Sequence, residues 1–424
     1  MTVGATKNSP WVGRDLPRRE GHDKVTGRAI YIDDMPVQDV IYGATVRSTL
    51  ARGVIKEIRF GVGVPWDEVT VVTAKDVPGA NEVRLLKADQ PLLADGEVNH
   101  VEEPIALIAH PNREVVQRAL RAISVEIEAR PAVHTIEAAL AGDEVVWGDD
   151  NVFAEYNVSR GDVEAGMSGA HLVLEGEYST GAQEQMYIEP QGMVARWDGE
   201  GVTIWGSLQC PYYVQAAVAP MFGLEEHQVR VVQTVTGGGF GGKEEYPSII
   251  AGHAALLAKK SGKTVKLIYD RVEDVTATTK RHPSRTKIRS AVDADGRLLA
   301  LEIDFAIDGG AYVTLSPVVL SRGTIHAAGP YRCPNVTVRS HAVATNSPPH
   351  GAFRGFGAPQ SIFALERHLD RVAVALKMDP AELRRNNLLV RGDTTAVGLL
   401  IEENIDLGGV LDTAMTSARY AERR

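Results

Sequence analysis

A cluster of glycines followed by charged residues carries the strongest chemical signal in this sequence. Five of the six residues from Gly237 to Gly242 are glycines, and Lys243 and Glu244 come next. Residues without a side chain expose backbone N–H groups and let a ligand approach the chain closely. A strand-like apolar stretch precedes the cluster and a helix-like apolar stretch follows it. The cluster is therefore typical of a loop that holds an anion or a flat cofactor, or of a tight turn without a ligand.

Two nucleotide-binding motifs match this cluster in part. Gly237, Gly239 and Gly242 satisfy the dinucleotide pattern G-x-G-x-x-G, but the acid that would bind a ribose, Asp270, lies 28 residues after Gly242 instead of about 20. The phosphate-loop pattern G-x-x-x-x-G-K also fits, but Glu244 stands where a Ser or Thr would bind magnesium. In a third interpretation the amides face an anionic cofactor group, and Glu244 is a polar contact for a substrate.

Two further segments combine loop-forming residues with polar side chains. In residues 351–360, Arg354 stands between aromatic residues in a glycine-rich loop. A guanidinium there can bind a phosphate or a pterin, and a phenyl ring can stack on a flat ligand. In residues 181–190, Gln183 and Glu189 interrupt strand-like sequence and could form functional hydrogen bonds in the interior. The structural alternatives are an arginine ion pair beside core phenylalanines and an ordinary polar strand face.

Local patterns predict the elements that hold these segments. Residues 229–270 read as strand, glycine loop, helix and strand, and residues 286–312 read as a hairpin that turns at Asp295-Gly296. Apolar residues at helical spacing predict a helix over 362–376. Asp379, followed by proline and a later acid, predicts the start of another helix. Each polar segment therefore adjoins a regular element that can position it.

The first third of the chain predicts a separate unit. Strand-like stretches cover 41–49 and 66–74, and Asn112 can cap a helix over 113–123. We expect an N-terminal arm over 1–20, a compact α+β domain over 21–135, a connector over 136–165 and a larger α+β domain over 166–424. The last residues read as a helix. A length of 424 residues agrees with two to four domains at about 150 residues each.

Composition excludes several functional classes. The chain has 45 basic and 55 acidic residues and a net charge of −10, so nucleic acid is not an expected partner. Two cysteines, Cys210 and Cys333, are too few for a disulfide framework, a zinc quartet or an iron–sulfur cluster. A cytoplasmic location agrees with this low cysteine content. Neither a signal peptide nor an apolar run long enough to span a membrane is present.

Taken together, the three polar segments resemble a known family. GAQEQMYIEP (181–190), TGGGFGGKEE (236–245) and GAFRGFGAPQ (351–360), in this order and spacing, are similar to the molybdenum-cofactor-binding subunit of the xanthine dehydrogenase/aldehyde oxidase family. The stretches 12–48, 271–312 and 322–335 resemble further segments of that family, so the match runs from Val12 to about Leu407. It implies a small N-terminal α/β hammerhead-like domain, followed by the first large molybdopterin-binding domain of α+β class.

The resemblance assigns roles to individual residues. It implies that Gln183 lies near the molybdenum, that no side chain ligates the metal directly, and that backbone amides of the glycine loop face the metal–pterin centre. The cofactor-binding positions that it implies are Gln183, Gly239, Phe240, Gly241 and Arg354.

Three further positions match residues that contact substrate in the family. Glu244 and Arg322 match the carboxylate and the guanidinium that act in catalysis and substrate binding by purine hydroxylases, and Phe356 matches a ring that stacks on the substrate. An acid and an arginine that face one flat ring suit a substrate with N–H and C=O groups. The structural alternatives are a solvated acid at a helix start for Glu244 and an ordinary ion pair for Arg322.

The family hydroxylates heterocycles beside nitrogen, or oxidises aldehydes, with oxygen taken from water. The resemblance therefore implies a purine hydroxylase acting on xanthine or hypoxanthine, with a molybdenum–molybdopterin cofactor whose cytosine dinucleotide form is an open option. The general-base glutamate belongs to the second half of the molybdenum subunit in this family, and this sequence resembles the first half. Expected partners are a second molybdopterin-binding subunit that carries this glutamate, an iron–sulfur subunit with 2Fe–2S clusters and a FAD subunit.

Other interpretations stay open from the sequence. Nicotinate-type hydroxylases fit because some of them divide the molybdenum subunit into two chains near this point. Hydroxylation of another N-heterocycle or of an aldehyde is a further option. A non-catalytic assembly partner, or a truncated product with half a cofactor site, would also give this sequence.

Overall fold

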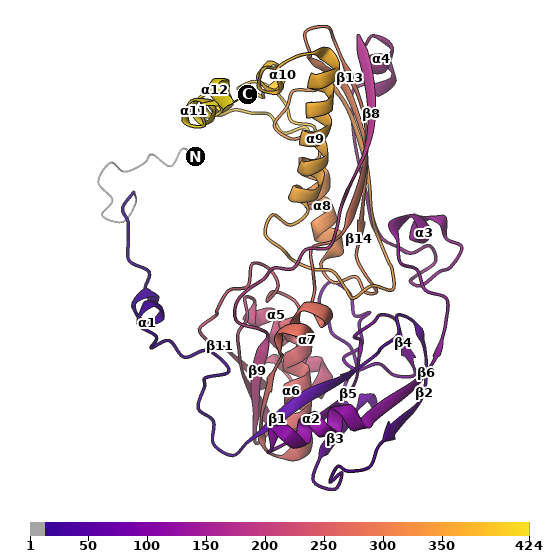
Figure 1. Cartoon of the computed structure of the whole chain (residues 1–424), viewed down its shortest axis with the longest axis vertical. Coiled ribbons are helices and arrows are strands. Elements are labelled where there is room, and N and C mark those ends of the chain that lie inside the picture. Colours follow the sequence, from indigo (N-terminus) through magenta and orange to yellow (C-terminus); the bar gives the residue numbers. More distant parts are fainter. Residues whose placement is uncertain (1–12, 424) are drawn as a thin grey trace.

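The chain forms two main β-sheets that lie one above the other in the view of Figure 1, with loops that cross between them. This computed structural model describes residues 13–423. The upper sheet is packed against long helices, and the lower sheet carries a buried helix and the N-terminal strands. The polar segments predicted from the sequence lie on the crossing loops.

The lower sheet has seven strands and mixes parallel with antiparallel pairs. Its helix α6 (Pro247–Ser261) is buried from Pro247 to Ala258, which explains why its sequence is apolar on all sides. The strands in spatial order are β11 (Val229–Gln233), β10 (Gly201–Gly206), β9 (Gly192–Asp198), β12 (Thr264–Ile268), β1 (Val40–Arg47), β5 (Pro104–His110) and β3 (Thr70–Thr73). Helices α5 (Pro211–Phe222) and α7 (Arg271–Ala277) belong to the same half.

The upper sheet has five strands. One of its faces packs against α8 (Ser316–His326) and α9 (Ala358–Leu376), whose inward apolar residues join one core with the strands. In spatial order the strands are β7 (Val152–Arg160), β15 (Asn335–Val343), β14 (Leu298–Asp308), β13 (Ser284–Val292) and β8 (Leu172–Thr180). The predicted hairpin with its turn at Asp295-Gly296 is confirmed, because β13 and β14 pair antiparallel around it. The helix α4 (Val163–Ser168) lies at one end of this sheet.

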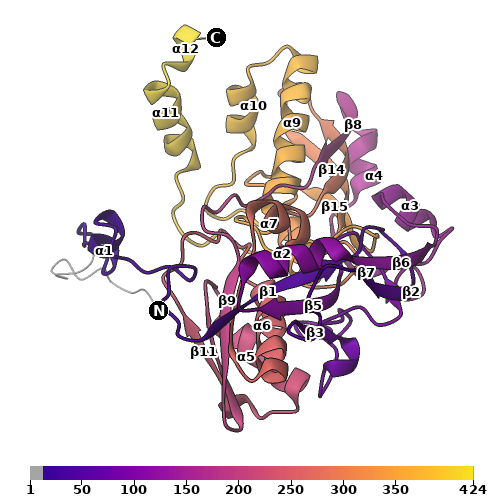
Figure 2. The same ribbon diagram turned by 60° about the horizontal axis from the view of Figure 1, so that its bottom comes forward.

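A small sheet completes the N-terminal part. It contains β4 (Glu97–Val98), β2 (Gly53–Phe60) and β6 (Ile123–Ala129). The helix α2 (Arg113–Ala122) begins as predicted, because the side chain of Asn112 accepts a hydrogen bond from the N–H of Glu114. Its apolar face packs on β1 and β5. Figure 2 shows this helix lying across the strands of the lower half.

The structure changes the expected division of the chain in two respects. First, β1, β3 and β5 of the expected domain 21–135 share the lower sheet with strands of the expected domain 166–424, and Val40 pairs with Thr264 in parallel register. Second, the expected connector 136–165 contains α3 (Ile136–Ala141) and the long edge strand β7. Long-range strand pairing, which has no local sequence signal, is the reason for the shared sheet and for the edge strand β7.

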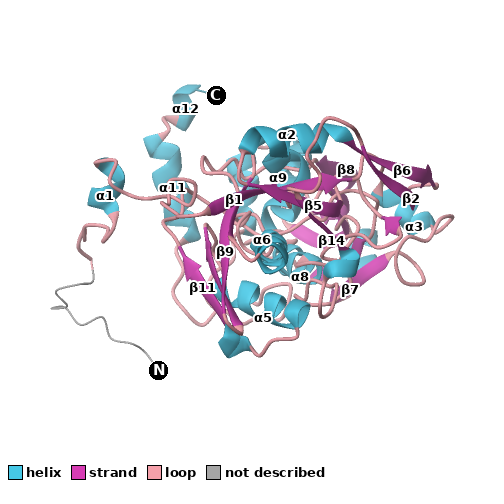
Figure 3. Ribbon diagram, turned by 90° about the horizontal axis from the view of Figure 1, so that it is seen from below, coloured by secondary structure: helices cyan, strands magenta, loops and turns pink. Residues whose placement is uncertain are grey.

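Both ends of the described chain extend from the body. Of the predicted arm 1–20, residues 1–12 lie outside the described residues, and α1 (Gly21–Val25) follows at the left edge of Figure 1. After α10 (Pro380–Asn387), the predicted C-terminal helix is confirmed as α11 (Leu407–Ser417) and α12 (Tyr420–Arg423), neither of which buries a residue. Figure 3 shows α1, α11 and α12 apart from the sheets. Among residues 13–423, no helix has the length and apolar character that a membrane crossing requires.

Candidate active site

The three polar segments meet where the chain crosses between the two sheets. We call residues 181–190, 236–245 and 351–360 the three site loops; they follow β8, β11 and β15, respectively. Nε2 of Gln185 donates a hydrogen bond to the carbonyl of Ala352 at 2.8 Å, which joins the first loop to the third. The N–H of Arg354 donates to the carbonyl of Phe240 at 2.9 Å, which joins the third loop to the second. The sequence segments are therefore one connected site.

Each site loop contains one non-glycine residue in the left-handed backbone region. These residues are Met186, Phe240 and Phe356, with φ angles of 53°, 54° and 51°. Glycines with φ of 95° and 96° stand on both sides of Phe356. This conformation is unfavourable for residues with a Cβ atom, and such strain is concentrated at functional sites in proteins. The backbone supports the assignment of all three loops to a binding site.

A buried ion pair fixes the base of the glycine loop. Nζ of Lys243 lies 3.1 Å from Oε2 of Glu189 and 2.8 Å from Oγ of Ser207, and no part of Lys243 is exposed. The same carboxylate oxygen accepts a hydrogen bond from the N–H of Gly237 at 2.6 Å. Burial lowers the pKa of Lys243, while Glu189 acts in the opposite direction. The lysine is enclosed in the protein, so the phosphate-loop interpretation is wrong.

The dinucleotide interpretation is also wrong. The carboxylate of Asp270, which that interpretation requires at a ribose, accepts a hydrogen bond from the N–H of Glu273 at 2.8 Å and caps α7. The helix after the glycines begins only at Pro247. The loop therefore does not place glycine amides at a helix N-terminus, which is the geometry that binds a pyrophosphate.

The predicted cofactor-binding residues differ in how far they are exposed to solvent. Phe240 has 51% of its surface exposed, and Gln183 and Arg354 are exposed as well. Gly239 lies against the side chain of Gln209, where an added Cβ atom would be 2.4 Å from Oε1. A hollow of about 690 Å³ opens beside these glycines, and Lys24 of α1 and Tyr31 line its other side. Its volume is in the range of small-molecule sites.

Gly241 requires a correction. The resemblance implies that its N–H faces the cofactor, but this N–H donates a hydrogen bond to Oε1 of Gln209 at 2.9 Å. The need for glycine is instead steric, because φ is 105° and an added Cβ atom would lie 2.6 Å from the carbonyl carbon of Ala352. Gly241 is a point of close approach between the second and third site loops.

The three predicted substrate residues lie on three different elements. Glu244 is half-buried at the end of the glycine loop, and burial raises its pKa. Arg322 is exposed on α8, next to Gly323, which packs on the backbone at Gly357. Phe356 is partly buried against the upper core. Among residues 13–423, neither Glu244 nor Arg322 forms an ion pair, so the structural alternative of an ordinary ion pair for Arg322 is not observed there.

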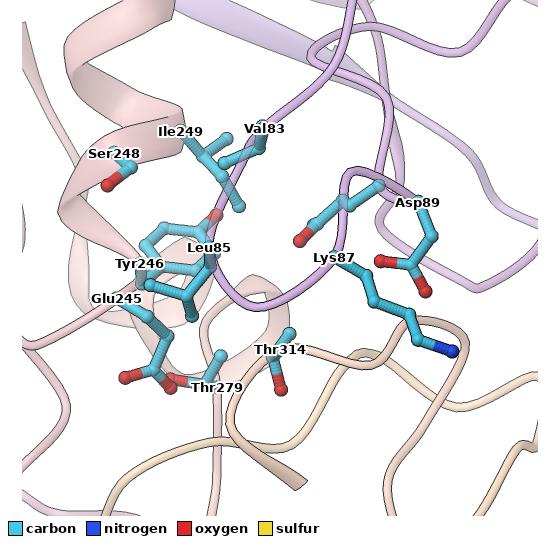
Figure 4. A pocket seen from close by; sticks show the side chains of 11 residues that line it. Val83, Leu85, Lys87, Asp89, Glu245, Tyr246, Ser248, Ile249, Thr279 and Thr314 are labelled. Atoms are coloured by element: carbon cyan, nitrogen blue, oxygen red, sulfur yellow. The ribbon is translucent and has the colours of Figure 1, made fainter. Parts of the chain in front are cut away.

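Glu245, next to Glu244, has a different environment. It is 5% exposed, and Oε1 accepts a hydrogen bond from the N–H of Ala352 at 2.9 Å. Burial raises its pKa to about 7. Its Oε2 and the hydroxyl of Thr279 are both buried, and the hydroxyl acts against the rise of this pKa. They lie beside a cavity of about 20 Å³ that Thr314 also lines. Figure 4 shows Glu245 and Thr279 side by side in this pocket, with Thr314 next to them. The cavity is large enough for one water molecule.

The structure adds residues that the sequence patterns did not reveal. Gln185, Gln209 and Glu245 hold the site loops by hydrogen bonds to backbone groups. Glu245 could have been noticed as the second of two consecutive glutamates, because neighbouring side chains point in different directions and can meet different environments. Gln185 lies in the polar segment 181–190 but was not distinguished from its neighbours there, and Gln209 matches a glutamine of the resembling family whose hydrogen-bond partner the sequence does not indicate. Among residues 13–423, no group of three or more His, Cys, Asp or Glu residues is arranged to hold a metal ion.

The site suits a cofactor that brings its own metal ligands. The hollow is lined by glycines and by the strained Phe240, and the neighbouring site loops expose the amide of Gln183 and the guanidinium of Arg354. Such groups can bind a flat, anionic molecule. The carboxylate of Glu189, which lines the hollow, already binds protein groups. The residues present therefore fit a molybdopterin.

Comparisons with known proteins agree with this arrangement. Residues 147–388 match the model of the molybdopterin cofactor-binding domain, and residues 26–131 match the aldehyde oxidase and xanthine dehydrogenase a/b hammerhead domain. The nicotinate dehydrogenase large molybdopterin subunit of Eubacterium barkeri is 35% identical over 410 residues, which cover 96% of each chain. A probable xanthine dehydrogenase subunit of Bacillus subtilis is 38% identical over 374 residues, 88% of this chain and 50% of that protein.

A solved structure shows the same fold. The aldehyde oxidoreductase from Desulfovibrio gigas superposes with a TM-score of 0.88 and 30% identity, over 96% of this chain and 46% of that chain. This chain thus spans nearly all of the Eubacterium subunit but about half of the other two proteins. The family matches, the two relatives and the strained site loops lead to one conclusion: the chain belongs to the xanthine dehydrogenase/aldehyde oxidase family, as a molybdopterin-binding subunit with a hammerhead domain.

Proposed function

We propose that this chain supplies one side of the active site of a molybdenum hydroxylase that acts on a purine such as xanthine or hypoxanthine. The observation that carries the purine assignment is that Glu244, in the second site loop, and Arg322, on the helix α8 whose Gly323 packs near Gly357, form no ion pair among residues 13–423. When bound, the molybdenum–pterin group supplies the redox chemistry, with oxygen derived from water. The protein supplies binding, orientation and charge.

We assign separate roles in cofactor binding and substrate binding to these residues. In this proposal Gln183 and Arg354, both exposed, hold the cofactor, and Phe240 contributes an exposed ring in the strained glycine loop. Phe356 orients a flat substrate by stacking. Burial raises the pKa of Glu244, which favours a carboxyl group that can share a hydrogen bond with a ring nitrogen. The guanidinium of Arg322 stabilises negative charge that develops on a purine oxygen.

The remaining parts of the reaction belong to partner chains in this proposal. A second molybdopterin-binding subunit carries the general-base glutamate, and iron–sulfur and FAD subunits receive the electrons. The cytosine dinucleotide form of the cofactor stays an open option. No residue of this chain is assigned to proton abstraction from the attacking oxygen.

A nicotinate-type substrate is the second candidate, and one observation favours it. The Eubacterium barkeri protein, a nicotinate dehydrogenase subunit by name, matches over nearly the full length of both chains. Nicotinate carries a carboxylate, so a free guanidinium such as Arg322 would also suit it. The two candidates differ in the role of Glu244, because an anionic substrate disfavours an ionised carboxyl nearby.

The experiment is purification of the full chain from its host, followed by metal analysis and a substrate screen. We expect a co-purifying molybdopterin-binding chain, molybdenum in the complex, and turnover of xanthine or hypoxanthine above that of nicotinate and aldehydes. Turnover of nicotinate alone would replace the purine assignment by the second candidate. A chain without partner, molybdenum or turnover would show a non-catalytic or truncated product and overturn the proposal.

A further inference from the structure

Arg281 contacts two of the three site loops. Its side chain is buried, with 7% of the residue exposed. Nε donates a hydrogen bond to Oε1 of Gln183 at 2.7 Å, and Nη2 donates to the carbonyl of Arg354 at 2.9 Å. Its guanidinium carbon lies 4.1 Å from the centre of the Phe353 ring. One guanidinium therefore connects the first and third site loops.

The positive charge of Arg281 has no negative partner among residues 13–423. No carboxylate pairs with it there, and its Nη1 atom is buried without a hydrogen-bond acceptor. The acid beside its contact residue, Glu184, is paired instead with Lys280 at 2.8 Å. Burial alone lowers the pKa of Arg281. An uncompensated charge in the interior is strongly unfavourable, so this arrangement favours an anion close to the guanidinium.

The contact also determines which end of the Gln183 amide is available. A glutamine side chain has one acceptor oxygen and one NH₂ donor. Arg281 holds the oxygen through one of its two lone pairs, which fixes the orientation of the amide. The NH₂ group therefore faces away from Arg281 and can donate a hydrogen bond to an acceptor atom of a ligand.

We propose that Arg281 is a positioning residue for the cofactor: it turns the NH₂ group of Gln183 toward an acceptor atom of the anionic metal–pterin group, and its buried charge is balanced only when that group is bound. The inference rests on the proposed function, since it takes this cofactor as the anion. Arg281 acts through Gln183 and the backbone of Arg354, which explains how a residue with so little exposed surface affects the site.

The test is a double-mutant cycle in the full chain produced without molybdopterin synthesis. Gln183→Glu replaces NH₂ by an oxygen and places a carboxylate against Arg281. Arg281→Met removes the charge with little change in length. We expect Gln183→Glu to raise the Tm of the cofactor-free chain by about 2 °C, because it supplies the missing negative partner, and to have no such effect in the Arg281→Met background.

Cofactor retention is measured in parallel on chains produced with molybdopterin synthesis. We expect molybdenum and pterin content to fall at least tenfold in both Gln183→Glu and Arg281→Met. Arg289→Met is the matched control, because Arg289 pairs with Glu302 at 2.8 Å on the upper sheet, outside the site loops, and it should retain full cofactor content.

The outcomes separate this inference from the proposed function. Equal Tm changes from Gln183→Glu in the two backgrounds, or a lower Tm in the wild-type background, would overturn the role of Arg281. Full cofactor content in Arg281→Met would overturn it as well. Absence of molybdenum from the wild-type chain and its complex would instead refute the proposed function, while the thermal cycle would still report whether the buried charge lacks a partner.

Discussion

The ammonium group of Lys243 lies 3.1 Å from Oε2 of Glu189, and the lysine has no exposed surface. The two residues are 54 positions apart in the sequence and connect the first and second site loops. Because the N–H of Gly237 bonds to the same oxygen, this ion pair sets where the glycine loop begins. It is a structural support of the site, and Glu189 also lines the hollow where we place the cofactor.

Removal of the lysine should therefore be costly. Lys243→Met leaves the largely buried Glu189 carboxylate without its cation, and we expect a loss of about 3–5 kcal/mol in the free energy of unfolding. The double variant Lys243→Met/Glu189→Gln should recover more than half of that loss. The control is Lys260→Met, which breaks the partly exposed pair with Asp76 and should cost less than about 1 kcal/mol. Urea denaturation of the wild-type chain and the three variants measures these values, and equal losses for Lys243→Met and Lys260→Met would contradict the expectation.

Glu245 should make stability depend on pH. Burial raises its pKa from 4.5 to about 7, so the folded chain keeps this proton between these values while the unfolded chain loses it. The stabilisation is complete below pH 4.5 and is lost as the pH rises through 7. The loss corresponds to about 3 kcal/mol. Urea denaturation at pH 5 and pH 8.5 should show it in the wild-type chain and not in Glu245→Gln. The same pH dependence in both chains would show that another group is responsible.

Local sequence patterns accounted for most regular elements, and the reasons are physical. The cap at Asn112 and the turn at Asp295-Gly296 depend on neighbouring residues only, and both were predicted correctly. The parallel pairing of Val40 with Thr264 depends on residues far apart, so the shared lower sheet had no local signal. The same contrast holds for the site. Glycines and Arg354 mark the site loops in the sequence, whereas the contact between Arg281 and Gln183 joins residues far apart in the chain and could be seen only in the structure.

Gly241 offers a test of the contact between the site loops. An alanine there would have φ of 105° and a Cβ atom 2.6 Å from the backbone of Ala352. Gly262 is a matched control, because it also has positive φ, 67°, but an added Cβ atom would meet nothing within 4 Å. We expect Gly262→Ala to cost about 1 kcal/mol of stability and Gly241→Ala at least twice that amount. Chemical denaturation measures both, and equal costs would mean that the two loops separate without penalty.

Arg322 should decide between a purine and a nicotinate substrate. Arg322→Met removes the charge that we assign to a purine oxygen, so kcat/KM for xanthine or hypoxanthine should fall about 100-fold, with the fall in kcat rather than a rise in KM. Arg322 is exposed on α8, outside the three site loops, so the molybdenum content should stay unchanged. Arg339→Met, which removes an arginine paired with Glu302 at 2.7 Å on the upper sheet, is the control and should keep wild-type kinetics.

The pattern across substrates distinguishes the two candidates for the reaction. If the guanidinium stabilises charge that forms only during purine oxidation, the loss appears in kcat because the transition state alone is affected. If Arg322 instead binds the permanent carboxylate of nicotinate, its removal raises KM for nicotinate and leaves kcat nearly constant. Unchanged purine kinetics in Arg322→Met, with molybdenum retained, would reject the purine assignment and leave the carboxylate-binding role as the one to test at this position.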